Sequence, residues 1–437
     1  MPRQLPRKSA SWFGPVRSPS RALRAAAPRV VATLACLVVL AVAAVAAPNP
    51  VSGPKKEEGF QTAAPYAILI DAETGTVLFE KSADTPSPPS SLAKLMTAEV
   101  VFDALKSGRI TLDTEYEISE DSWRHGGAPS HTSSMFAPIH SMVRVEDLLR
   151  GMIIQSGNDA AMALAEGLAG SQRAFVDLMN KRAKALGLTH STFGNATGLP
   201  DPNNMVTMRD MAQLARHIIK TYPDYYKIYG EPEFTWNKIR QRNRNPLLSL
   251  DIGADGMKTG YTEDGGYGLI GSATQNGLRL ILAINGLKSS KERAEEGKRL
   301  LEWGFTGFEA RPLFAKDQPI GWAKVFGGAE GSVPLVAARA VSVLVPRNTS
   351  DRITAKIVYT GPVPAPVAEG TPVGTLRVFR GDNVTLEVPL ATATAVPRGN
   401  LPQRAFDVVT ELVFGWVRAG FQRLVDGHWG VRSADAG

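Results

Sequence analysis

Ser91-Leu92-Ala93-Lys94 places a hydroxyl three residues before an amine at the start of an apolar, helix-periodic stretch over residues 92–105. Side chains three apart on a helix share one face. Serine is a poor nucleophile until a base accepts its proton, and lysine can do so only when its pKa is lowered. The spacing thus predicts a nucleophile, Ser91, and its base, Lys94. Taken alone, a capping serine beside a solvated lysine explains the pair better.

A second motif, Ser156-Gly157-Asn158, is the only Ser-x-Asn in the sequence. We expect it in a loop between helices over residues 145–154 and 159–168. A second hydroxyl there can relay a proton to a leaving amine, and the Asn158 amide can hold a substrate and the catalytic lysine. Capping of the second helix by Ser156 or Asn158 is compatible with these roles.

A third motif, Lys258-Thr259-Gly260, is predicted to precede or open a strand. Lysine and threonine together suit a substrate carboxylate, and glycine lets a substrate backbone approach a strand edge. The alternative for the motif alone is a polar turn. The three motifs fall in order within one predicted domain, and their combination carries more weight than any single one.

The flanking pattern predicts an α+β domain with a central antiparallel sheet over residues 65–309. Strand patterns stand at both ends of this domain, and helical periodicity lies between them. The predicted strands are residues 66–70, 76–79, 266–273 and 278–287, and further predicted helices are residues 208–220 and 291–303.

A small all-β domain is predicted over residues 310–398, where short β-branched runs alternate with Gly and Pro. After it, apolar residues recur at helical spacing within residues 399–437, including Phe406, Val409 and Trp416. This pattern predicts an amphipathic helix that anchors the chain at a membrane surface. The alternative is a helix docked on its own protein.

The N-terminal region has the pattern of an export signal over residues 1–47, followed by a polar linker over residues 48–64. An uncleaved membrane helix is the alternative, because the apolar run is just long enough to span. The formal net charge of +7 equals the seven basic residues that precede Val30, where no acidic residue occurs. The basic balance therefore does not indicate nucleic-acid binding. The single cysteine, Cys36, lies in the apolar run, so the exported protein would contain neither a disulfide nor a thiol nucleophile.

The match extends beyond the three motifs to residues 89–98 (PSSLAKLMTA), 255–262 (DGMKTGYT) and 327–335 (GGAEGSVPL). From Pro65 to the C-terminus the chain resembles the low-molecular-mass penicillin-binding proteins, the serine-type D-alanyl-D-alanine carboxypeptidase family. This resemblance implies a penicillin-binding/β-lactamase-like fold, a β-rich second domain and a C-terminal amphipathic anchor. It also implies removal of the terminal D-alanine from peptidoglycan stem pentapeptides, acylation by β-lactam antibiotics, and a place on the periplasmic face of the cytoplasmic membrane.

The resemblance assigns a role to each motif residue. Ser91 is the acylated nucleophile and Lys94 its general base. The other implied roles are proton relay and substrate contacts for Ser156 and Asn158, carboxylate binding for Lys258, Thr259, Gly260 and Arg244, and an oxyanion hole from the backbone N–H groups of Ser91 and Tyr261. Neither a metal nor a cofactor is implied.

Three alternatives stay open at this stage. A β-lactamase shares the acylation step, but the added β domain and terminal helix argue against it, and no deacylating glutamate is identifiable. A DD-endopeptidase uses the same residues on a cross-linked substrate. A non-catalytic wall-binding protein is disfavoured by the intact motifs. The stretch Met205-Val206-Thr207 departs from the family pattern near the loop that assists deacylation.

Overall fold

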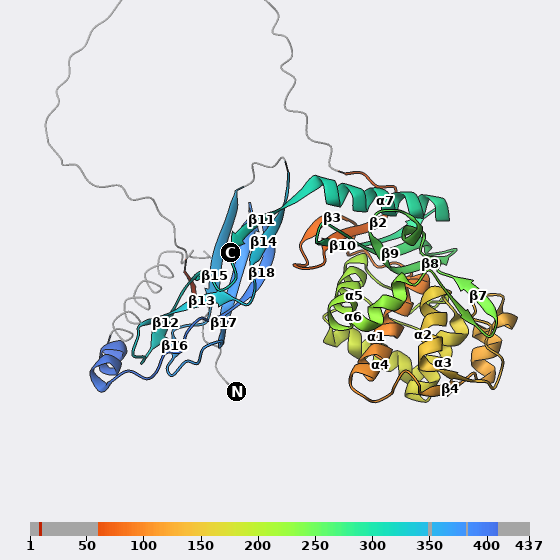
Figure 1. Cartoon of the computed structure of the whole chain (residues 1–437), viewed down its shortest axis with the longest axis horizontal. Helices are drawn as coiled ribbons and strands as arrows, with labels where there is room; N and C mark the ends of the chain where they lie inside the picture. The colour runs from red at the N-terminus through yellow and green to blue at the C-terminus, as the bar shows by residue number, and fades with distance from the viewer. Residues whose placement is uncertain (1–7, 11–59, 348–351, 382, 410–437) are drawn as a thin grey trace, which may run out of the picture. The chain divides into compact units, whose positions relative to one another are not determined.

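The computed structural model describes residues 8–10, 60–347, 352–381 and 383–409 (Figure 1). Its first domain is built on a five-stranded antiparallel sheet in the order β3-β2-β10-β9-β8. The strands are β2 (Tyr66–Asp71), β3 (Val77–Lys81), β8 (Ala254–Thr262), β9 (Gly266–Gln275) and β10 (Leu278–Leu287). The sheet confirms the predicted α+β class, and β8 forms one of its edges.

Helices cover both faces of this sheet (Figure 1). Helix α7 (Ser290–Gly307) packs on β9 and β10, and α5 (Met208–Thr221) packs against β2 and β10 from the other face. Because both faces are covered, β10 is buried continuously from Leu280 to Asn285 rather than at alternate positions.

The helical half of the domain lies between β3 and β8 in sequence. Helix α2 (Val145–Ile154) has the predicted bounds, and α3 (Asn158–Ala169) begins one residue earlier than predicted. The remaining helical elements are η1 (Ser90–Ala93), α1 (Lys94–Lys106), η2 (Ser122–Gly126), η3 (Ala128–Ser130), α4 (Gln172–Ala185), α6 (Pro223–Tyr226), η4 (Lys227–Gly230) and η5 (Pro246–Ser249). Two small hairpins pair β4 (Glu115–Glu117) with β5 (Met142–Arg144) and β6 (Glu233–Trp236) with β7 (Ile239–Arg242).

Helix α4 was not predicted, and its sequence explains the omission. It buries a narrow stripe, Phe175, Met179 and Ala183, at a spacing of four residues, while the rest of its surface is polar. The local signal was its N-cap, since the Ser171 side chain accepts a hydrogen bond from the backbone N–H of Ala174.

The second domain is all-β, as predicted. One sheet has the order β1-β15-β17-β18-β13-β12-β16, and a separate pair joins β11 to β14. The strands are β1 (Lys8–Ala10), β11 (Phe308–Phe314), β12 (Gly321–Phe326), β13 (Ser332–Ala337), β14 (Val341–Pro346), β15 (Ile353–Tyr359), β16 (Val363–Pro364), β17 (Pro372–Arg380) and β18 (Asn383–Thr392). Its own core gathers inward-facing residues such as Leu335, Leu376 and Val378.

Residues 401–409 are helical, which agrees with the start of the predicted amphipathic helix, and Leu401, Phe406 and Val409 are exposed there. The predicted anchor residues from 410 onward lie outside the described residues, as does most of the predicted signal segment and linker. Within the described ranges, no helix combines the length and apolar character needed to cross a membrane.

Candidate active site

The predicted nucleophile and base lie on a tight turn that leads into a helix. Ser91 belongs to the 3-10 turn η1, and Lys94 is the first residue of α1, so the helix starts with a tighter turn than predicted. The Lys94 Nζ atom is 3.1 Å from the Ser91 Oγ atom. The two groups are therefore within hydrogen-bonding distance, which is the geometry that a serine and its base require.

Lys94 is only 1% exposed and makes further contacts across the domain. Its Nζ donates to Asn158 Oδ1 at 2.7 Å and to the backbone carbonyl of Thr197. Burial lowers the pKa of Lys94 to about 7, with a further lowering by Arg244 and an opposing effect of Asp159. A substantial neutral fraction then exists at neutral pH, which is the form that can accept a proton from Ser91.

The second motif bridges the other two. Ser156 has a positive φ of 66° in the connection between α2 and α3, and its Oγ accepts a hydrogen bond from Lys258 Nζ at 2.9 Å. Asn158 begins α3 and contacts Lys94 on one side, while its Nδ2 donates to Thr132 Oγ1 at 2.9 Å on the other. The structure thus brings all three motifs into one hydrogen-bonded cluster.

The capping expectation for this motif is wrong. The N-cap of α3 is Gly157, and no side chain caps the helix. The neighbouring Asp159 instead fixes a loop, because its buried carboxylate accepts hydrogen bonds from Ser134 Oγ and from the backbone N–H groups of Met135 and Ala137. It therefore holds residues 134–137 against the motif, a role that the sequence analysis missed.

The third motif lies inside a strand rather than before it. Lys258, Thr259 and Gly260 are buried residues in the second half of β8, so the prediction that the motif precedes or opens a strand is wrong. A β-carbon on Gly260 would lie 3.1 Å from Leu92 Cγ and from the carbonyl oxygen of Pro89. Because Gly260 has no side chain, η1 can pack directly against β8. This role is additional to the predicted approach of a substrate backbone.

Positive charge is concentrated around this strand. Burial holds the pKa of Lys258 well below its usual value, and Lys94, Arg244 and Arg293 lower it further. Arg244 Nη1 donates to Ser133 Oγ at 2.6 Å, which places the predicted arginine beside the second motif. Such a cluster suits an anionic ligand, because an anion would offset the mutual repulsion.

Arg293 on α7 is a candidate site residue that the sequence analysis missed. Its Nη1 is 3.5 Å from the carbonyl oxygen of Gly260, and its guanidinium lies 5.6 Å from the ring centroid of Tyr267. The Nε atom is buried and has no hydrogen-bond partner among the described residues. In sequence it is one charge among many on an amphipathic helix, so only the packing of α7 against β9 and β10 singles it out.

The predicted oxyanion-hole residues come from the two elements that meet at the site, Ser91 from η1 and Tyr261 from β8. The Tyr261 ring is half-exposed and stacks on Tyr267, with ring centroids 4.2 Å apart. Gly198 closes the other side of η1 at a φ of +79°; a β-carbon there would lie 1.8 Å from the Ser90 carbonyl oxygen. The nucleophile is therefore held between β8 and the turn at residue 198.

Comparison with known proteins agrees with this geometry. Residues 52–289 match the family model described as D-alanyl-D-alanine carboxypeptidase, which is more than half of the chain. The chain belongs to the D-alanyl-D-alanine carboxypeptidase family. Residues 308–398 match a second family model, the C-terminal domain of penicillin-binding protein 5. The resemblance that the motifs suggested is thereby confirmed.

Individual members of the carboxypeptidase family match over most of their length. D-alanyl-D-alanine carboxypeptidase DacC of Escherichia coli is 41% identical over 357 residues, which cover 81% of this chain and 89% of the relative. The crystal structure of penicillin-binding protein 5 from Haemophilus influenzae superimposes with a TM-score of 0.69 at 36% identity, covering 78% of this chain and 99% of that one. Penicillin-binding protein D2 from Listeria monocytogenes, solved in an ampicillin-bound form, is 30% identical with a TM-score of 0.51 and covers 56% and 99%.

Proposed function

We propose that the chain is a serine-type D-Ala-D-Ala carboxypeptidase that removes the terminal D-alanine from peptidoglycan stem pentapeptides through an acyl-enzyme. The observation that carries this proposal is the buried Lys94, whose Nζ lies 3.1 Å from Ser91 Oγ and whose pKa is lowered to about 7. Membership of the carboxypeptidase family supports the choice of substrate.

Acylation begins when the substrate's terminal carboxylate enters the positive cluster at Lys258, Thr259, Arg244 and Arg293. Ser91 Oγ then attacks the carbonyl carbon of the penultimate D-alanine, and its proton passes to the neutral Lys94. The negative charge that develops on the carbonyl oxygen is stabilised by the backbone N–H groups of Ser91 and Tyr261.

Release of D-alanine requires a proton on its amine. The proton that Lys94 accepted from Ser91 passes by way of Ser156, which Lys258 contacts at 2.9 Å, to this amine. The peptide C–N bond breaks to leave an ester on Ser91, and Lys94 is neutral again. A water molecule then attacks the ester while Lys94 accepts the proton of that water. Hydrolysis returns the serine hydroxyl and the shortened peptide. A β-lactam ring opens on the same serine, and the ampicillin-bound relative supports this reaction.

The test is D-alanine release from diacetyl-L-Lys-D-Ala-D-Ala by the purified protein, beside Ser91→Ala. We expect Ser91→Ala to reduce release and covalent labelling by penicillin more than about a thousandfold while the fold stays intact. Covalent labelling of this variant by penicillin would contradict the assignment of Ser91 as the nucleophile. Ser91-dependent labelling without release would instead favour a DD-endopeptidase, which a cross-linked substrate would reveal; rapid turnover of the penicillin ester would favour a β-lactamase-like hydrolase.

We further propose export by residues 1–47 and peripheral anchoring at the outer surface of the cytoplasmic membrane by residues 399–437. The apolar run behind a basic segment supports export, and the exposed Leu401, Phe406 and Val409 on the helical residues 401–409 support anchoring. Fractionation of cells that express the chain truncated after residue 398 tests this: the truncated protein should move from the membrane to the soluble exported fraction. Equal membrane association of both forms would contradict the anchor.

A further inference from the structure

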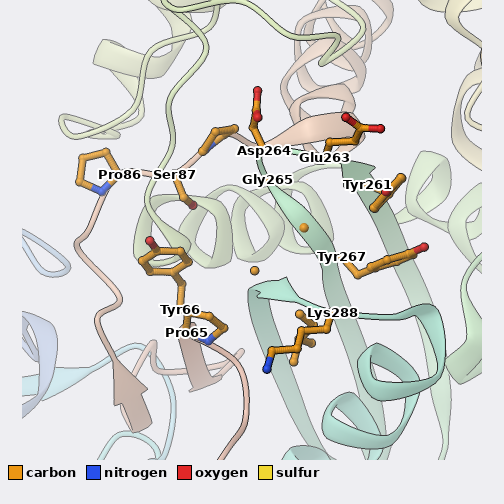
Figure 2. Close-up of a pocket in the computed structure, with 14 residues that line it drawn as sticks. Pro65, Tyr66, Pro86, Ser87, Tyr261, Glu263, Asp264, Gly265, Tyr267 and Lys288 are labelled. Carbon is orange, nitrogen blue, oxygen red and sulfur yellow. The ribbon is translucent and has the colours of Figure 1, made fainter.

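Two adjacent hollows lie beyond the end of β8. The larger has a volume of about 600 Å³ and lies among the β8–β9 turn, the end of β10 and the start of β2 (Figure 2). The smaller, about 390 Å³, lies between this turn, the segment that precedes Ser91 and the turn after Gly198. Pro88 and Asp264 line both, and we call the two hollows together the β8 trough.

The order of residues along β8 places this trough on the acyl side of the substrate, an inference that rests on the proposed function. Lys258 and Thr259, to which the proposed function assigns the terminal carboxylate, precede Tyr261, to which it assigns the oxyanion of the scissile carbonyl. A peptide aligned with the strand therefore runs from its carboxylate toward Tyr261. The residues before the scissile bond continue past Thr262 to the turn at residues 263–265 and into the trough.

The turn is fixed relative to the nucleophile. Thr262 Oγ1 lies 2.8 Å from Ser90 Oγ and accepts a hydrogen bond from the backbone N–H of Gly265 at 3.1 Å. A β-carbon on Gly265 would lie 2.9 Å from Ser90 Oγ and 3.0 Å from the Pro88 carbonyl oxygen. The turn is thus packed directly on the segment that carries Ser91, which fixes the backbone of residues 262–265 relative to the nucleophile.

The trough carries an excess of negative charge. Glu263 and Asp264 lie along one edge of the larger hollow, with Tyr66 and Lys288 at the opposite edge (Figure 2). Asp201 adds a further carboxylate to the smaller hollow. The exposed Glu263 and Asp264 form neither an ion pair nor a hydrogen bond through their carboxylates within the described part of the chain. Three carboxylates against one ammonium favour a cationic ligand.

A buried amide without hydrogen-bond partners lies in the wall of the smaller hollow. Asn204 lines the smaller hollow and is only 2% exposed, yet neither its Nδ2 nor its Oδ1 has a hydrogen-bond partner among the described residues. A buried carboxamide without partners is costly, and a peptide group carries the acceptor and the donor that it lacks; both amide atoms are closed off from the hollow, so they pair with a ligand only after the side chain turns. The apolar side chains of Leu199 and Met205 beside it suit the aliphatic part of a side chain.

We propose that the β8 trough binds the substrate residue that precedes D-Ala-D-Ala, and that Glu263 and Asp264 select a side chain with a free ammonium group. The trough thereby makes the enzyme prefer stem peptides whose diamino acid is not yet acylated on its side chain. Both carboxylates act on binding of the peptide and take no part in the bond-breaking steps.

The experiment compares Nα-acetyl-L-Lys-D-Ala-D-Ala, which has a free ammonium, with the neutral Nα,Nε-diacetyl peptide. We expect kcat/KM for D-alanine release to be about fivefold higher for the cationic peptide, mainly through KM, because exposed charge pairs are each modest in strength. This ratio should fall to about one in the double variant Glu263→Gln, Asp264→Asn and at high salt.

Two control variants test the location and the sign of the charge. Asp251→Asn removes an exposed carboxylate just before the other end of β8 and should leave the ratio unchanged; Lys288→Gln removes the opposing charge and should raise it. Equal kcat/KM for the two peptides in the unaltered enzyme, or an unchanged ratio in the double variant, would overturn the subsite. If the unaltered enzyme neither releases D-alanine from either peptide nor is labelled by penicillin at Ser91, the proposed function is refuted.

Discussion

The centre of the active site and the β8 trough use charge in opposite ways. At the centre, Lys94 and Lys258 are almost completely buried, and each is held by hydrogen bonds to other motif residues. In the trough, Glu263 and Asp264 are exposed and unpaired within the described structure. Burial lowers the pKa of Lys94 and creates a base, whereas exposed carboxylates stay solvated and each interacts only weakly with a ligand. Changes at the centre should therefore have far larger effects than changes in the trough.

The largest effect is expected from Lys94→Met. This change removes the general base but keeps most of the length of the unbranched side chain, so we expect kcat/KM for D-alanine release to fall about a thousandfold. Penicillin acylation should slow to a similar degree in a stopped-flow measurement. Lys106→Met, at the exposed end of the same helix, is the matched control and should remain within about twofold of the unaltered enzyme. Comparable losses in both variants would disprove the role of Lys94.

A smaller but still large loss of activity is expected from a change at Gly198, which packs against the turn that carries Ser91. A β-carbon in Gly198→Ala would lie 1.8 Å from the Ser90 carbonyl oxygen and would displace Ser91 from Lys94. Misplacement of this order lowers activity about a hundredfold. Gly170→Ala is the control, since Gly170 has the same φ of +79° but open space around it. It should lower the free energy of unfolding by about 1 kcal/mol, measured by urea denaturation, while kcat stays unchanged.

The pH profile tests the burial of Lys94 directly. Because its pKa is lowered to about 7, the neutral base is lost as pH falls through that value, and kcat/KM should decrease about tenfold per pH unit below it. Above pH 7 the profile should be flat until another group titrates. Arg244→Gln removes a positive charge that lowers this pKa, so the inflection should move to higher pH. An inflection at the same pH in both enzymes would show that Arg244 does not affect the pKa of Lys94.

The smallest effect is expected in the trough. Neutralising both Glu263 and Asp264 should leave hydrolysis of the neutral diacetyl peptide within about twofold and the Tm unchanged, because exposed unpaired charges contribute little to stability. A drop of tenfold or more with this neutral substrate would show that the trough takes part in the chemistry, and the contrast between the two regions would then be wrong.

Much of the fold was accessible from local pattern. Helix α2 has its predicted bounds because its hydrophobic periodicity and its acidic first turn, Glu146 and Asp147, both favour a helix over the same residues. The β-rich runs were likewise predicted from β-branched residues between Gly and Pro. Helix α4 and the hairpin of β6 and β7 were missed, since each buries only a few side chains and leaves little periodic signal.

Three short motifs already identify the parts of the active site: a serine and lysine at helical spacing, a Ser-x-Asn, and a Lys-Thr-Gly, in that order. How these residues work together depends on the folded chain, because desolvation and contacts between distant segments produce no local sequence pattern. Folding buries Lys94 beside Asn158 and the turn at Thr197, places Lys258 within an edge strand, and brings Arg293 from α7 to Gly260. The lowered pKa values of Lys94 and Lys258 arise from this burial, and the trough beyond β8 arises where residues 86–90 meet the β8–β9 turn.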